Sequence, residues 1–266
     1  MARAAGAGTG AGTGAGGAVT GCSFVQITDH HLRPDEREET GGRETAAALR
    51  ATLAHLAAHD ADVDFVVCTG DVVETPDDAS YAFARELLGT LGGMPLRVLP
   101  GNHDDRDRWY AWMAPDGRPG GRHHWAFERG GVQFVGVDWG TGGEPRGEPG
   151  LYDFLRERLR ADTPTVVFTH HHVVPTGIPW VDALLTADVE EFGRLLRGAP
   201  VLGVFSGHAH CTYESTLEGV PVWGLRSTAP QFAREPAPRV VHLPPHYRRV
   251  DVRDGRLATR IVEVAP

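Results

Sequence analysis

The sequence predicts a single α/β domain, and three observations support that fold class. Short β-branched or aromatic runs that stop at turn residues alternate with segments whose apolar residues recur at helical spacing. The chain has 266 residues, of which 41% are hydrophobic, which is enough for one large core but would crowd two domains. Residues that can bind metals follow the ends of several predicted strands. A repeated strand-then-helix order favours a largely parallel sheet.

The strand pattern recurs six times before residue 210. The predicted strands are 23–28, 63–69, 96–100, 132–138, 165–169 and 201–206. Between them, helices are predicted at 43–59, 81–91, 151–160 and 188–196. The last part of the chain alternates polar and apolar residues around two turn dipeptides, Glu218-Gly219 and Asp254-Gly255. This pattern predicts antiparallel hairpins at 212–225 and 248–264 that form a second sheet.

The first residues differ in composition from the rest. Residues 1–21 are almost entirely Ala, Gly and Thr, with one arginine and no apolar run of the kind that a secretory signal needs. We therefore expect a disordered tail at 1–21 and one domain at 22–266. Since no later stretch approaches the ~20 apolar residues of a membrane span, the sequence predicts a soluble protein that does not bind membranes.

Composition excludes several kinds of chemistry. The three cysteines, Cys22, Cys68 and Cys211, are odd in number and lack CxxC spacing, so a reducing compartment, the cytoplasm, is predicted rather than a disulfide framework. All 26 basic residues are arginine, which removes Schiff-base and P-loop lysine chemistry. A net charge of -9 disfavours a nucleic-acid polymer as the partner.

Five short segments carry acidic, imidazole and amide side chains directly after predicted strands. They contain Asp29 and His31, then Gly70-Asp71, Gly101-Asn102-His103-Asp104, His170-His171-His172 and Gly207-His208-Ala209-His210. Because the carboxyl ends of such strands meet at one edge of the sheet, these segments can converge on one crevice. Their ligand types suit Zn, Mn or Fe, and two such ions would activate a bridging hydroxide for attack on phosphorus.

Other interpretations compete for individual residues. Either Asp29 or Asp71 alone fits a helix N-cap or a turn, although the five segments together favour a metal site. Asp104 and Asp105 are interpreted as structural. The aromatic stripe of Trp109, Tyr110 and Trp112 has helical spacing, which is typical of core residues rather than of a nucleobase platform.

The motif set resembles the calcineurin-like metallophosphoesterase superfamily over residues 24–264. Three segments are similar to its cyclic-nucleotide and glycerophosphodiester phosphodiesterase branch (class III type): residues 101–106, the His-rich run ending Pro175-Thr176-Gly177, and residues 226–232. The resemblance implies a four-layer α/β/β/α sandwich of two mixed β-sheets flanked by helices. It also implies two divalent metal ions (Mn, Fe or Zn) as cofactors.

The resemblance further implies a role for each matching residue. One metal would be held by Asp29, His31, Asp71 and His210, and the second by Asp71, Asn102, His170 and His208, with Asp71 bridging. His170 is preferred over His171 because it comes first after its predicted strand. His103 would donate a hydrogen bond or a proton to the leaving oxygen, and Glu74 would orient it, in place of the aspartate that many relatives have there.

Substrate contacts are predicted from the same segments. The candidates for phosphate contact are Asn102, His103, His171 and Arg106. For both Arg106 and Arg226, a contact with phosphate or ribose competes with an ordinary surface position. Trp180 and Asp182 lie on a predicted loop above the sheet, where specificity residues are common.

Three functions stay open from the sequence alone. The first is a phosphodiesterase that acts on a small diester, with cyclic AMP as the leading candidate. The second keeps the metals but takes a phosphomonoester or a nucleotide pyrophosphate. The third is a non-catalytic metal-binding scaffold, which predicts loss of a ligand or of the Asn102-His103 pair. The oligomeric state is open between a monomer and a homodimer.

Overall fold

The computed structural model describes residues 21–114, 121–141, 145–159 and 162–264. The predicted disordered tail lies outside the described residues, except that Gly21 is the first residue of a strand. The single domain predicted for 22–266 stays a prediction.

The first of two large sheets has the strand order β15-β14-β1-β4-β5. Its strands are β1 (Gly21–Ile27), β4 (Phe65–Cys68), β5 (Leu96–Val98), β14 (His246–Arg253) and β15 (Arg256–Glu263). β1, β4 and β5 are parallel to one another, whereas β14 pairs antiparallel with both β1 and β15. The sheet is therefore mixed.

The second large sheet has the order β10-β11-β9-β8-β7-β6. Its strands are β6 (Trp125–Arg129), β7 (Val132–Val137), β8 (Thr165–Thr169), β9 (Val201–Ser206), β10 (Tyr213–Leu217) and β11 (Val220–Gly224). β7, β8, β9 and β11 are parallel, and β6 and β10 run antiparallel to their neighbours. Two short pairs, β2 (Glu39–Thr40) with β3 (Arg43–Glu44) and β12 (Gln231–Phe232) with β13 (Val240–Val241), lie outside both sheets.

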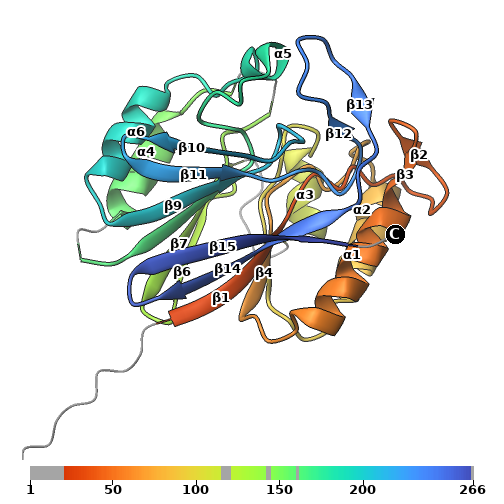
Figure 1. Cartoon of the computed structure of the whole chain (residues 1–266), viewed down its shortest axis with the longest axis horizontal. Coiled ribbons are helices and arrows are strands. Elements are labelled where there is room, and N and C mark those ends of the chain that lie inside the picture. The colour runs from red at the N-terminus through yellow and green to blue at the C-terminus, as the bar shows by residue number, and fades with distance from the viewer. Residues whose placement is uncertain (1–20, 115–120, 142–144, 160–161, 265–266) are drawn as a thin grey trace, which may run out of the picture.

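Helices cover the outer face of each sheet (Figure 1). The first sheet packs against α1 (Thr45–His59), α2 (Asp78–Gly89) and α3 (Arg106–Trp112). The second packs against α4 (Pro149–Arg158), α5 (Pro179–Asp182) and α6 (Val189–Arg197). Of the helices in the described ranges, none is sufficiently long and apolar to cross a lipid bilayer.

An aromatic core joins the two sheets. The Phe24 ring of β1 contacts the rings of Phe65, Phe134, Phe168 and Phe205, with centroid distances of 5.2–5.7 Å. Successive side chains of a strand point to opposite faces, so Val25 and Ile27 of β1 point instead toward the helices. Strands buried on both faces need apolar residues at nearly every position, which explains why the sequence pattern is continuous rather than alternating.

The four-layer α/β/β/α arrangement is confirmed, whereas the division of strands inferred from residue patterns alone was wrong. The parallel strands are shared between two sheets, and the C-terminal hairpins do not form a sheet of their own. β14 and β15 extend the first sheet beside β1, and β10 and β11 extend the second beside β9. Because every central strand is buried on both faces, its sequence carries no signal of the sheet to which it belongs.

Element boundaries agree closely where turn residues are clear. β8 and β9 match the predicted 165–169 and 201–206, while β6 and α3 were not predicted. α3 begins after Asp105, whose carboxylate accepts a hydrogen bond from the Arg108 N–H. Trp109 and Tyr110 on this helix are buried, so their interpretation as core residues is confirmed.

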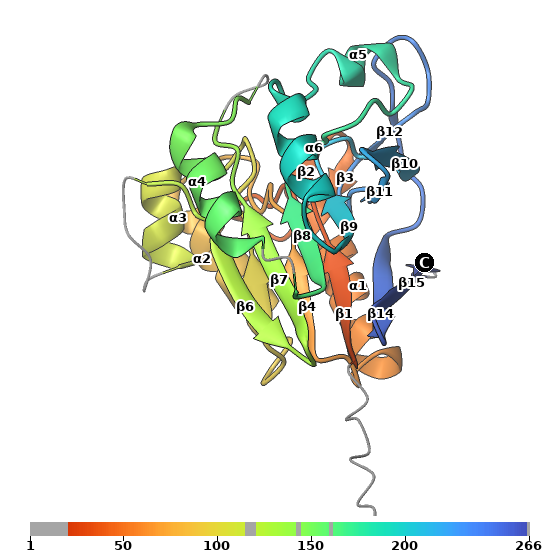
Figure 2. The ribbon, with the colours of Figure 1, turned by 90° about the vertical axis from the view of Figure 1, so that its left-hand side faces the viewer.

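The carboxyl ends of central strands from both sheets meet at one edge. The Asp29 N–H after β1 donates to the Gly70 carbonyl after β4 at 2.9 Å. Across the two sheets, the Gln26 Nε2 donates to the Ser206 carbonyl at 3.1 Å. In Figure 2 the α5, β12 and β3 segments lie at the upper end of the strands, above this edge. The predicted site segments therefore begin side by side.

The aromatic core gives a stability prediction. Phe24→Ala should lower the free energy of unfolding by about 3–5 kcal/mol, because it leaves a cavity between four other rings. Urea denaturation measures the change. Leu243→Ala is the control, since Leu243 is 43% exposed and its truncation should have little effect. A loss at Phe24 no larger than at Leu243 would contradict the assigned core.

Candidate metal centre

Five of the seven predicted ligands have left-handed backbone conformations. Their φ angles lie between 47° and 64°, and the residues are Asp29, His31, Asp71, His208 and His210. This conformation costs a non-glycine residue roughly 1–2 kcal/mol. Only three other described non-glycine residues adopt it: Asp188, Glu218 and Asp254. Strain concentrated at strand ends is typical of functional sites, and here it turns the side chains inward.

Two glycines let the ligand loops approach each other. A Cβ atom on Gly101 would lie 2.1 Å from Asp71 Oδ1 and 2.4 Å from the Asp71 backbone nitrogen. A Cβ atom on Gly207 would lie 2.1 Å from Thr28 Oγ1 and 2.5 Å from Asp29 Oδ2. Neither position has space for a side chain, because a carboxylate of the site occupies it.

The first group of side chains consists of Asp29, His31, Asp71 and His210, all buried, with ligand atoms within 4.8 Å of one another. The Nε2 atoms of His31 and His210 are 3.0 Å apart, and the His210 Nε2 is 3.4 Å from Asp29 Oδ1. Asp29 is fixed by the Thr28 hydroxyl, which donates at 2.6 Å, and by the His208 N–H at 3.1 Å.

A second group lies on the other side of Asp71. Asp71 Oδ2 is 3.3 Å from His170 Nε2 and 3.5 Å from His31 Nε2, so one oxygen atom faces both groups. Asn102 Oδ1 is 3.0 Å from His170 Nε2. The ligand atoms of His170, His171 and His208 lie within 4.8 Å of one another. The geometry brings all seven predicted ligands to this edge.

The hydrogen bonds of three histidines fix which ring nitrogen is available to bind a metal. His170 Nδ1 and His210 Nδ1 bond to the carbonyls of Thr69 and Pro230 at 2.8 and 2.7 Å. His31 Nδ1 lies 2.7 Å from Glu74 Oε2. Because carbonyls and carboxylates only accept, each Nδ1 carries a proton, and in the neutral form of the ring the Nε2 is left with a lone pair that can bind a metal.

Two of these lone pairs, on His31 and His210, then face each other at 3.0 Å, which is repulsive unless a proton or a cation lies between them. The Nε2 of His208 is buried, with no hydrogen-bond partner among the described residues. Neutral imidazole nitrogens and carboxylates are ligands for divalent transition metals. The residues present therefore fit metal ions.

The site also concentrates negative charge on two buried carboxylates, Asp29 and Asp71. Burial alone would raise the pKa of Asp29, but the His210 and His170 rings lower it to about 2. Burial opposes ionisation of Asp71 as well, yet His170 and His31 hold its pKa well below the usual range. Conversely, burial would lower the pKa of His170, whereas the Asp71 carboxylate raises it to about 9. The carboxylates thus attract positive charge to the ring nitrogens.

His103 lies beside the cluster and lines a pocket that is next to it. Its N–H donates to Asp71 Oδ1 at 2.9 Å, and its side chain is 37% exposed. Its Nδ1 is 3.4 Å from the Glu74 carbonyl and 3.6 Å from Glu74 Oε2. The Glu74 carboxylate is closer to His31, whose hydrogen bond lowers its pKa. Glu74 therefore contacts a candidate ligand as well as the residue that it was predicted to orient.

Two of the predicted substrate contacts, Arg106 and His171, do not line the pocket next to the cluster. The Arg106 guanidinium binds both carboxylate oxygens of Asp138 and the carbonyls of Gly101 and Asp104, so it holds the loop together, away from the pocket lining. His171 is buried beside His208 and does not line the pocket.

The remaining candidates also have structural contacts. The Asp182 carboxylate accepts hydrogen bonds from Thr176 and Gly177. The Arg226 Nη2 donates to the Pro244 carbonyl and contacts Glu263. Asp104 accepts hydrogen bonds from the Gly101 and Val72 N–H groups and from the Tyr81 hydroxyl, as its structural interpretation requires.

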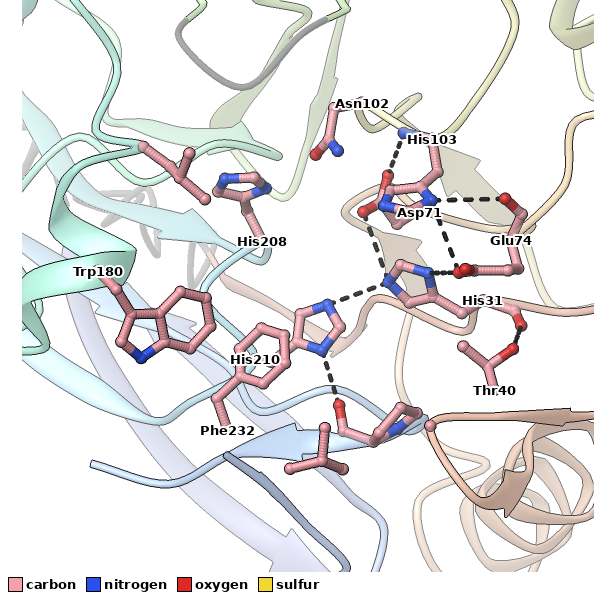
Figure 3. Close-up of a pocket in the computed structure, with 14 residues that line it drawn as sticks. His31, Thr40, Asp71, Glu74, Asn102, His103, Trp180, His208, His210 and Phe232 are labelled. Atoms are coloured by element: carbon pink, nitrogen blue, oxygen red, sulfur yellow. Dashed lines mark hydrogen bonds and ion pairs between the residues drawn. The ribbon is translucent and has the colours of Figure 1, made fainter. Parts of the chain in front are cut away.

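The cluster opens into a pocket of about 300 Å³ (Figure 3). Trp180 lines it, as predicted. The rest of its far wall consists of Thr40, Gly41, Leu184, Pro230, Phe232 and Val240. The resemblance singled out the segment 226–232, which contains Pro230 and Phe232, whereas sequence reasoning missed the other four. Gly41-Gly42 was a visible turn signal, but no sequence pattern places that turn opposite residues 230–240.

A four-layer sandwich with carboxylates and imidazoles at the shared strand edge defines a class of metal-dependent hydrolases. The chain belongs to the calcineurin-like phosphoesterase family, whose profile matches residues 22–212. The predictions of the superfamily and of an enzyme that hydrolyses phosphoric esters are thereby confirmed.

Relatives support the same assignment. The chain is 27% identical to the 3',5'-cyclic adenosine monophosphate phosphodiesterase CpdA of Haemophilus influenzae, over 91% of this chain and 89% of that protein. It is also 27% identical to a cAMP/cGMP dual specificity phosphodiesterase of Mycobacterium tuberculosis, over 75% of this chain and 65% of that one.

Solved structures show that the fold is shared by proteins of different kinds. A dimetal phosphatase from Danio rerio has a TM-score of 0.64 at 14% identity and covers 92% of this chain and 99% of its own. GAP50, an anchor in the inner membrane complex of Plasmodium, also reaches 0.64, at 12% identity, covering 92% of this chain and 85% of its own. The fold alone therefore does not decide between an enzyme and a scaffold.

The close approach of the ligand loops can be tested at one glycine. Gly101→Ala should lower the free energy of unfolding by about 1–3 kcal/mol, because its Cβ atom would overlap the Asp71 carboxylate. Gly89→Ala is the matched control, since no atom lies within 4 Å of the added Cβ. Denaturant titration of both variants measures the difference. Equal stability of the two variants would contradict the described approach.

Proposed function

We propose that the protein is a phosphodiesterase that hydrolyses a 3',5'-cyclic nucleotide, with cyclic AMP as the leading substrate and two divalent metal ions (Mn, Fe or Zn) as cofactors. The observation that carries this proposal is the single Asp71 oxygen that faces two groups of ligand atoms at the base of a pocket. The names of relatives that match nine-tenths of the chain support the choice of substrate.

The ligands divide between the metals as follows. One ion would be held by Asp29, His31, Asp71 and His210, and the other by Asp71, Asn102, His170 and His208. His170 is preferred over His171 because its Nε2 faces both Asp71 and Asn102. Such a pair of ions, when bound, supplies Lewis acidity to the phosphoryl group and lowers the pKa of bound water.

The residues of the chain supply positioning and proton transfer. The hydrogen bond from the His103 backbone N–H to Asp71 fixes this histidine next to the candidate metal ligands, while its partly exposed ring reaches the pocket. It would donate a hydrogen bond or proton to the departing oxygen. Glu74 would hold both His31 and His103, so that a ligand and the proton donor keep a constant relative position.

Two other functions differ from this proposal in the substrate or in the residues that they need. A phosphomonoesterase or a nucleotide pyrophosphatase would use the same metals. A scaffold would need neither an accessible His103 nor a complete ligand set, and both are present. The three cysteines are free and buried, which supports our proposal of a reducing compartment such as the cytoplasm.

The proposal is tested by activity of the metal-loaded protein on a small panel. We expect hydrolysis of cyclic AMP and bis-p-nitrophenyl phosphate, and slower hydrolysis of p-nitrophenyl phosphate. Preference for the monoester would replace the phosphodiesterase with a phosphatase. No hydrolysis of any ester with both metals bound would favour the scaffold.

Replacement of the shared carboxylate should remove the metals. Asp71→Asn keeps the shape of the side chain but removes the anionic oxygen that both ions would share, so we expect loss of metal and activity together. Elemental analysis after reconstitution with manganese measures metal per chain. Asp78→Asn, on the exposed start of α2, is the control. Two ions retained by the Asp71 variant would contradict the bridging role.

His103→Ala should separate metal binding from turnover. It removes a proposed proton donor without removing a ligand, so kcat should fall ~10²–10⁴-fold while metal content stays constant. His59→Ala, at the end of α1, is the control. An unchanged kcat would make His103 a structural residue.

A further inference from the structure

We propose that the pocket selects substrates whose non-phosphoryl part carries an uncharged aromatic ring, such as a nucleobase, and selects against a second phosphate. The selecting surface, called here the aromatic wall, consists of Trp180 and Phe232. This inference rests on the proposed phosphodiesterase function and concerns the half of the substrate that the metals do not hold.

The aromatic wall lies directly beside the candidate metal ligands. The Phe232 ring stacks on the ring of His210, with centroids 4.5 Å apart and planes at 10°. Trp180 meets Phe232 at 4.7 Å and 71°. Figure 3 shows Trp180, Phe232, His210 and His31 following one another across the pocket. A phosphoryl group at the metals therefore has an aromatic surface within reach of the group esterified to it.

The backbone fixes the position of this wall. The Phe232 N–H donates to the His210 carbonyl at 3.3 Å, so a displacement of the wall would also move a candidate ligand. Trp180 is held from the other side by α5, whose Val181 is buried in the core of the second sheet. A surface held in this way loses little conformational entropy when a planar group binds to it.

Three other side chains of the far wall are apolar, and Thr40 is its polar member. Leu184, Pro230 and Val240 line the pocket together with the two rings. Val240 and Leu243 are the exposed large hydrophobic residues of the described chain, at 39% and 43%, and both lie on the segment that begins at β13. Exposed apolar side chains beside a polar metal cluster are typical of a binding site with two chemically different halves.

Charge gives an independent reason for selectivity. Among the described residues, the fourteen that line the pocket include no arginine, and the sequence has no lysine. Glu74 adds a carboxylate to the lining, whereas Arg33, 3.8 Å from that carboxylate, does not line the pocket. Away from the metals, a second phosphate would leave water for an apolar wall or meet this carboxylate, with no arginine or lysine in the pocket lining to balance it. A nucleoside half has no such charge.

The aromatic wall is tested by its effect on substrate preference. The measured quantity is the ratio of kcat/KM for cyclic AMP to kcat/KM for glycerophosphoglycerol, a monoanionic diester without a ring. For Trp180→Ala, we expect this ratio to fall about tenfold, because loss of one base–aromatic stack raises the KM for cyclic AMP. Trp180→Phe should restore most of the ratio. Trp112→Ala, in α3 and outside the pocket, should leave the ratio constant.

Selection against a second phosphate is tested separately. Adenosine diphosphate should react far more slowly than cyclic AMP, and Val240→Arg, which places a cation at the rim, should narrow that difference. Equal rates for cyclic AMP and adenosine diphosphate in the unmodified enzyme would overturn the inference. So would a Trp180→Ala variant whose ratio of kcat/KM for cyclic AMP to kcat/KM for glycerophosphoglycerol equals that of the unmodified enzyme. If no diester is hydrolysed, the proposed function fails; if diesters are hydrolysed and the ratios do not move, only the aromatic wall fails.

Discussion

The buried carboxylates of Asp29 and Asp71 are the constraint on which the rest of the structure depends. Both are less than 2% exposed, and the charged groups that stabilise them are imidazole rings rather than arginines. Three of the candidate histidines, His31, His170 and His210, are oriented through Nδ1, so their Nε2 atoms lie 3.3–3.5 Å from a carboxylate oxygen. Buried carboxylates need a counter-charge, which protons on these rings or bound cations can supply. A pair of divalent cations would provide it, and would also make the site catalytic.

The sandwich brings these groups together because two sheets share one edge. The ring of Phe24 and its aromatic neighbours lock the sheets face to face, so the loops after β1 and β9 meet through the hydrogen bond from the His208 N–H to Asp29. At the same edge, left-handed backbone turns Asp71 and His210 inward. Local strain of this kind persists only where the surrounding packing is firm. The stability of the core and the geometry of the site are thus two results of the same packing.

The sequence predicted the strand ends well, and with them the residues that converge at this edge, because turn residues and polar side chains follow apolar runs at each end. It could not assign strands to sheets, since strands buried on both faces read alike. Arg106 illustrates a second limit: an arginine beside a motif suggests a phosphate contact, and only the fold shows that Asp138, distant in sequence, binds it. Phe232 illustrates a third, because its stacking on His210 depends on a short hairpin with no periodic pattern.

The most direct test is a crystal structure of the protein loaded with manganese, with an anomalous difference map recorded at the manganese edge. Our account predicts two peaks at the base of the pocket, both within bonding distance of the Asp71 carboxylate, with His31 and His210 at one and His170 and Asn102 at the other. A map with no peak there, or with a single peak that Asp71 does not contact, would contradict it.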